Sequence, residues 1–269
     1  MVLDVRRALR TGYDDLRSTA GLNVLSVLLV FNLVYGGVVA SFRQELLVVL
    51  RRSRSGTPPL ISTESRVGLD LLQFDLPLWL LALLAVLAVL VGEAIRFWAI
   101  RQFADLSLRS VPEVRERLPV FLTVAGGFAL LVFGLVEVVP LLWAANGAET
   151  MRLAAQSVGV VSLLLVGVTV YLRQELALTA GSARQTATRS VRRFVAEPVP
   201  ILGLLALLGL GGTLVGLPSV LAAAIGPAGN STVVQIGELV RVALSSILTT
   251  FSIAAITDAY IQIRGGTFR

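Results

Sequence analysis

The residues of this chain that could do chemistry are ionisable side chains near the ends of long apolar segments. Glu93 and Arg96 are three positions apart at the end of one segment, and Asp258 lies near the end of another. Residues three apart share one face of a helix, and ionisable groups at membrane depth are functional candidates. We expect Glu93, Arg96 and Asp258 to form one inner-side polar cluster, with a structural salt bridge favoured over a proton relay.

The residue types that the chain lacks exclude much other chemistry. All 23 basic residues are Arg, and the sequence contains no Lys, His or Cys. The usual zinc, haem and iron–sulfur ligands are therefore missing, so we expect no metal site and no cofactor. A Schiff base and a phosphate-loop lysine are excluded as well. We predict that the protein is not an enzyme, because only carboxylate chemistry would remain to it.

Six apolar segments must position these side chains. The chain has 269 residues, of which 55% are hydrophobic and 15% charged, and its mean hydropathy is +0.83. A helix needs about 20 apolar residues to cross a bilayer, and segments near that length occupy roughly 20–42, 77–100, 118–143, 154–176, 198–225 and 243–263. The sequence predicts one all-α domain, 1–269, built as an integral membrane bundle of six transmembrane helices in three hairpins.

Arg-rich amphipathic stretches precede each pair of segments, which divides the chain into the loose repeats 1–100, 101–180 and 181–269. Such helices lie in the membrane interface. We expect their basic side chains to face anionic lipid headgroups or a membrane protein partner rather than nucleic acid. The residues expected there are Arg6, Arg7, Arg10, Arg189, Arg192 and Arg193.

The distribution of arginine predicts the orientation. The N-terminal flank, the second-to-third and fourth-to-fifth connections and the C-terminus together carry 16 arginines, whereas the other side carries 7. Because loops rich in Arg stay in the cytoplasm, we expect a multi-pass protein of the cell membrane with both termini in the cytoplasm. A signal peptide is not expected, since the polar lead of about 19 residues carries three Asp and the first apolar segment is too long.

Small residues in the fifth segment predict close helix packing. Gly212 and Gly216 form a small-xxx-small pair of the kind that lets helices approach closely. Pro218 follows them and is expected to kink the helix. We favour a packing role for Gly212, Gly216 and Pro218 over the alternative of a hinge or substrate groove.

Four short stretches resemble a known family: Asp75–Leu78, Ala94–Phe103, Ser190–Phe194 and Asp258–Arg264. They are similar to haloarchaeal six-helix membrane proteins of unknown function, akin to the membrane domain attached to some glycerophosphoryl diester phosphodiesterases. The resemblance implies a six-helix membrane fold and no catalytic residues, since the phosphodiesterase activity belongs to a separate soluble domain.

These features favour a non-enzymatic scaffold or accessory subunit of a membrane transport or lipid-handling system. The alternative is a small transporter or permease subunit that uses the inner-side carboxylates Glu93 and Asp258.

Overall fold

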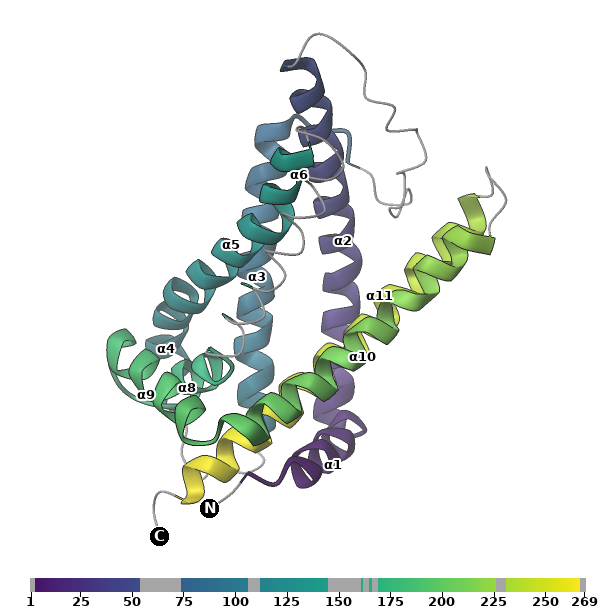
Figure 1. Cartoon of the computed structure of the whole chain (residues 1–269). Coiled ribbons are helices and arrows are strands. Elements are labelled where there is room, and N and C mark those ends of the chain that lie inside the picture. The colour runs from purple at the N-terminus through teal and green to yellow at the C-terminus, as the bar shows by residue number, and fades with distance from the viewer. Residues whose placement is uncertain are drawn as a thin grey trace.

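The chain folds as an all-α bundle in the computed structural model (Figure 1). The structure describes residues 3–53, 74–105, 112–144, 161, 165, 169–225 and 231–266, and within these ranges the regular secondary structure is entirely helical. Five helical stretches are long and apolar enough to cross a membrane: Thr19–Leu50, Leu78–Ala104, Val114–Trp143, Pro198–Ala222 and Thr232–Arg264. These stretches make the protein an all-α membrane bundle.

Five of the six predicted apolar segments correspond to these stretches. The sixth, 154–176, lies mostly outside the described residues. Its described end is a turn at 169–171, followed by the short helix α8 (Leu172–Leu178).

Three spans pack together as one group. They are α2 (Thr19–Ser53), α3 (Leu78–Asp105) and a third span in five parts. Figure 1 shows α10 (Pro198–Ile225) and α11 (Ser231–Gly266) crossing this group obliquely. Helices α10 and α11 pack along each other, and α11 also packs against α2 and α3.

The third span is not the continuous α-helix that its apolar pattern predicts. Helices α4 (Val114–Phe121), α5 (Gly127–Phe133) and α6 (Val139–Ala144) alternate with two π-helical segments, η3 (Leu122–Gly126) and η4 (Gly134–Val138). Wide turns of this kind occur frequently at functional sites. They also shift the phase of the residues that follow, so the face presented by η4 differs from the one that a regular helix would present.

The tightly packed core lies at one end of the bundle, here named the terminal end. It holds α1 (Val5–Leu16), α8, α9 (Ala183–Ala196), the start of α10 and the end of α11, as Figure 1 shows. The largest side chains buried there include Phe97, Phe121, Tyr171, Ile201 and Tyr260.

Capping residues fix where the two amphipathic helices begin. The Asp4 side chain accepts a hydrogen bond from the Arg7 backbone N–H at 3.0 Å. Ser182 and Gln185 form a reciprocal capping box at the start of α9. Such caps contribute about 1 kcal/mol each.

The N-terminal segment is fastened to the far end of the chain. The Leu3 backbone N–H donates to Glu197 at 2.8 Å, and the Asp4 backbone N–H donates to Gln262 at 3.1 Å. Gly12 lets α1 lie directly on α11, because a Cβ there would sit 2.9 Å from the Ala255 Cβ. The start of α1 and the end of α11 therefore lie at the same end of the bundle.

The predicted packing role of Gly212 and Gly216 is wrong. Among the described residues, a Cβ at either position would meet no atom of another helix within 4 Å. The close contacts of α10 and α11 are made by Gly211 against Leu248, and by Gly237 against the Pro218 carbonyl oxygen and Ala222. Pro218 thus takes part in the packing, but the small residue that accommodates it is on α11.

Candidate functional site

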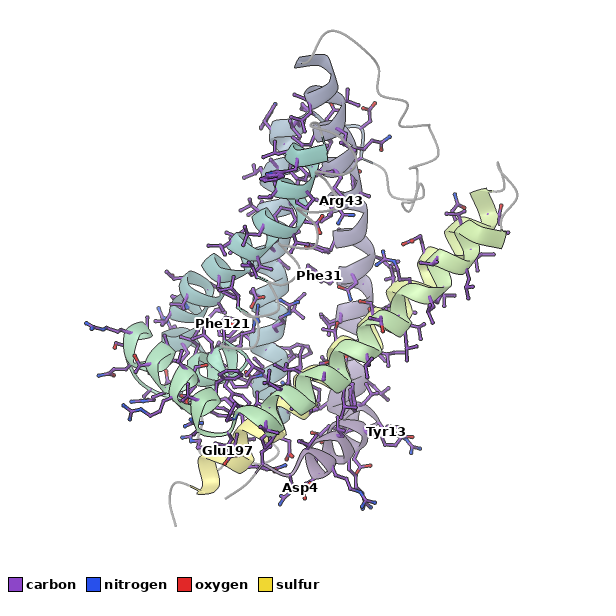
Figure 2. The ribbon with its side chains drawn as sticks, in the orientation of Figure 1. Asp4, Tyr13, Phe31, Arg43, Phe121 and Glu197 are labelled. Atoms are coloured by element: carbon purple, nitrogen blue, oxygen red, sulfur yellow. The ribbon has the colours of Figure 1, made fainter. Side chains whose placement is uncertain are left out.

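A cavity lies between α2, α3, the α5–η4 part of the third span and α11. Its volume is about 660 Å³. Apolar side chains form much of its wall, among them Phe31, Val89, Phe128, Phe133 and Val242. Figure 2 labels Phe31 and Arg43 along α2, with Arg43 nearer the end that is remote from α1. A cavity of this size matches the 300–1,000 Å³ typical of small-molecule sites.

Glu93 is the buried carboxylate beside the cavity, and two arginines bind it. Its side chain is fully buried. Arg173 forms a fork on it, with Nε donating to Oε2 and Nη2 to Oε1, both at 2.8 Å. Arg96, one turn along α3, also donates from Nη1 to Oε1. A bidentate arginine–carboxylate contact is among the stronger ion pairs, so Glu93 holds both guanidinium groups at the cavity wall.

Two further ion pairs line the same cavity. Arg43 on α2 contacts Glu137 on η4. On α11, Arg241 Nε donates to Glu238 Oε2 at 2.7 Å, and Glu238 is almost fully buried. Tyr35 also lines this cavity.

The charges of these groups do not cancel. Four arginines (Arg43, Arg96, Arg173 and Arg241) face three glutamates (Glu93, Glu137 and Glu238). The Arg43–Glu137 and Arg241–Glu238 pairs are each neutral, so the excess positive charge belongs to the two arginines that share Glu93.

The structure pairs Glu93 with Arg96, whereas Asp258 is bound to another residue. Asp258 accepts a hydrogen bond from Gln262 Nε2 at 2.6 Å, one turn further along α11. It also lies near Asp15 of α1, whose pKa is raised by burial, by Asp258 and by Asp14. Within the described residues, the cross-helix partner of Glu93 is Arg173, so the predicted three-residue cluster is wrong in its third member.

The helix that carries Glu93 is longer than its predicted apolar segment. Glu93 lies two residues beyond the midpoint of the Leu78–Ala104 stretch. The helix continues past the apolar segment, through Arg101, to Asp105. Because Glu93 is fully buried, its charge is balanced by arginine and not by lipid headgroups.

Arg193 differs from the other arginines expected at the lipid or partner surface. Its Nε lies 3.0 Å from Glu175 Oε1, and its guanidinium carbon lies 4.7 Å from the centre of the Tyr260 ring. Glu175 is fully buried and also accepts from the Thr179 hydroxyl at 3.0 Å. Arg193 is therefore an internal ion-pair residue, and its assignment to the surface is wrong.

The remaining arginines of that set are exposed at the terminal end. On α1 these are Arg6, Arg7 and Arg10, and on α9 they are Arg189 and Arg192. The first two turns of α1 thus carry three exposed arginines.

Sequence reasoning missed the role of Arg173. Arg173 stands two residues before Glu175 at the end of a predicted span, a position typical of a membrane-flanking arginine. Its partner lies 80 positions away in sequence. The only available signal was that Arg173 and Glu93 both lie next to long apolar segments, and that pattern does not identify a pair.

Metal binding has no support in the described part of the chain, where His, Cys, Asp and Glu form no group of three that could hold an ion. Comparison with known proteins gives no assignment either, since the chain matches no family model, no curated protein and no solved structure.

Proposed function

We propose that this chain is a non-enzymatic, six-span protein of the cell membrane with both termini in the cytoplasm. It serves a membrane transport or lipid-handling system by binding a ligand within the bundle. The observation that carries this proposal is the cavity of about 660 Å³ with four arginines and two glutamates in its wall. Charged groups at this depth are unfavourable unless they are paired or used.

The ion pairs support a binding role over catalysis. Glu93, Glu137 and Glu238 are each bound to arginine, so none of them is presented as a free general acid or base. Acid–base catalysis needs a carboxylate whose proton can move to a substrate. The same pairs hold the arginine side chains in fixed positions, which suits recognition of a ligand.

The experiment isolates the full chain in polymer-bounded discs cut directly from the membrane of the expressing cells. Small molecules in the discs are then identified by mass spectrometry. Ala129 lines the cavity, so Ala129→Trp fills part of the space. Val199 on α10 is 77% exposed, so Val199→Trp is the matched control.

The proposal predicts a compound that is enriched over bulk lipid with the wild-type chain and with Val199→Trp, and that is lost with Ala129→Trp. Identical contents in all three preparations would contradict it.

A second candidate function, a scaffold for a partner protein, rests on the exposed arginines of α9. In that case a protein co-isolates with the chain and is lost when Arg189 and Arg192 are changed to Gln, while Ala129→Trp retains it. Both arginines are exposed, so their replacement leaves the fold intact.

A further inference from the structure

We infer that the cavity binds a singly charged anionic amphiphile. A carboxylate or phosphate-type group lies against Arg96 and Arg173, and an apolar body lies along the phenylalanine wall. The inference rests on the proposed function, and it adds the chemical class of the ligand and the residues that recognise it.

The charge balance identifies the sign and the size of the ligand charge. Arg96 and Arg173 together carry two positive charges, and Glu93 between them carries one negative charge. An excess positive charge at the wall of a cavity favours an anionic ligand there. One negative charge from a ligand would complete the set, whereas a cation would add to the imbalance.

The hydrogen-bonding groups that remain at these arginines fit an oxyanion. Glu93 occupies Nη1 of Arg96 and both Nε and Nη2 of Arg173. The other guanidinium nitrogens of these two arginines make no hydrogen bond to a described residue. Both side chains line the cavity and retain exposed area, 41% for Arg96 and 24% for Arg173. Guanidinium groups bind carboxylates and phosphates through such N–H pairs.

The size and surface of the cavity call for an apolar body on the anion. A water molecule takes about 30 Å³ of liquid volume, so a cavity of about 660 Å³ has room for far more than a small inorganic anion. Its wall carries the rings of Phe31 and Tyr35, which stack with their centroids 5.6 Å apart, and also the separate rings of Phe128 and Phe133. Burial of an apolar chain against them contributes about 0.8 kcal/mol per CH₂.

Two sources could supply such a molecule: an anionic lipid or fatty acid from the bilayer, or an aromatic or aliphatic carboxylate from water. The chemistry recognised at Arg96 and Arg173 is the same for both, so the test includes a competitor from each source.

The test measures binding of dodecanoate to the full chain in discs of uncharged lipid, with empty discs as the blank. Dodecanol has the same chain without the charge, and acetate has the charge without the chain. We expect dodecanoate to bind at one site per chain, dodecanol at least tenfold more weakly, and acetate not to compete. Equal binding of dodecanol, or equal competition by acetate, would overturn the inference on the wild-type protein alone.

Variants then locate the site. Arg173→Gln should weaken dodecanoate binding at least tenfold, while Arg184→Gln, a change at an exposed arginine of α9, should leave it unchanged. Similar binding by the two variants would contradict the assignment. Competition by phosphatidylglycerol but not by benzoate indicates a bilayer source, and the reverse indicates a source in water.

The two proposals can fail separately. If dodecanol binds as well as dodecanoate while a native compound still depends on an open cavity at Ala129, the anion inference falls and the proposed function stands. If no native compound depends on the cavity, the proposed function falls whatever dodecanoate does.

Discussion

Replacing Arg193 by Gln should destabilise the protein far more than the same change at its neighbour Arg192. Arg193 is 20% exposed and balances Glu175, whose side chain is fully buried. Removing one partner of a buried ion pair typically costs about 3–5 kcal/mol. The remaining hydrogen bond from Thr179 to Glu175, 3.0 Å long, argues for the lower part of that range. The lost contact between the guanidinium and the Tyr260 ring, at 4.7 Å, adds about 0.5–2 kcal/mol.

Arg192 is the matched control because it differs from Arg193 by one position and by its exposure. Surface changes of this kind usually alter stability by less than about 0.5 kcal/mol. The assay is reversible unfolding of each variant in mixed detergent micelles by titration with dodecyl sulfate, followed by the fluorescence of the three tryptophans. Equal free energies of unfolding for the two variants would refute the argument that Arg193 is an internal residue.

Two other predictions concern packing and pH. Gly237→Ala should destabilise the fold by about 1–3 kcal/mol, because the added Cβ would lie 3.0 Å from the Pro218 carbonyl oxygen. Gly212→Ala, measured in the same titration, should be neutral or stabilising. The reverse order of the two stabilities would contradict the observed α10–α11 contact. Burial and the nearby Asp258 raise the pKa of Asp15 in the folded state. Ionised Asp15 therefore destabilises the fold at neutral pH. This destabilisation disappears as the pH falls below the pKa that Asp15 has in the unfolded chain. Asp15→Asn should therefore raise the free energy of unfolding at pH 7, and this gain should vanish near pH 3. A gain that does not change with pH would contradict the prediction.

The membrane-spanning helices were largely predictable from the sequence, because each depends on a property of one continuous segment. The apolar runs gave the approximate positions of α2, α3, α10 and α11, and the amphipathic periods gave α1 and α9. The ends were less accurate, since α3 continues past the predicted end at residue 100, through Arg101, to Asp105. A helix whose backbone is satisfied internally can extend past its apolar segment when other helices cover it.

The site was predictable only in its local part. The Glu93–Arg96 contact follows from helical spacing. The contacts of Glu93 with Arg173, and of Arg43 with Glu137, join residues 80 and 94 positions apart, and neither pair has a spacing signature. The two π-helical segments of the third span also change which of its residues face the cavity, and no residue pattern indicated them.

Glycine packing could not be read from spacing either. Gly212 and Gly216 have the small-xxx-small pattern but face open space, while Gly237 and Gly211 make the contacts. Which face of α10 meets α11 depends on the relative rotation of the two helices, and that rotation is set by the whole interface.

The most direct test of the central claim compares Glu93→Gln with Arg173→Gln in the dodecanoate-binding assay, after both variants are shown to be monodisperse and folded. Glu93→Gln removes the carboxylate that is bound to the two arginines, so dodecanoate should bind at least about tenfold more tightly to this variant. The reason is that one added net positive charge close to the ligand, at an effective dielectric constant near 20, contributes more than about 1.4 kcal/mol. Arg173→Gln removes a ligand-binding cation and should weaken binding. Changes in the same direction for both variants would mean that these residues only support the fold, and would contradict an anion site beside Glu93.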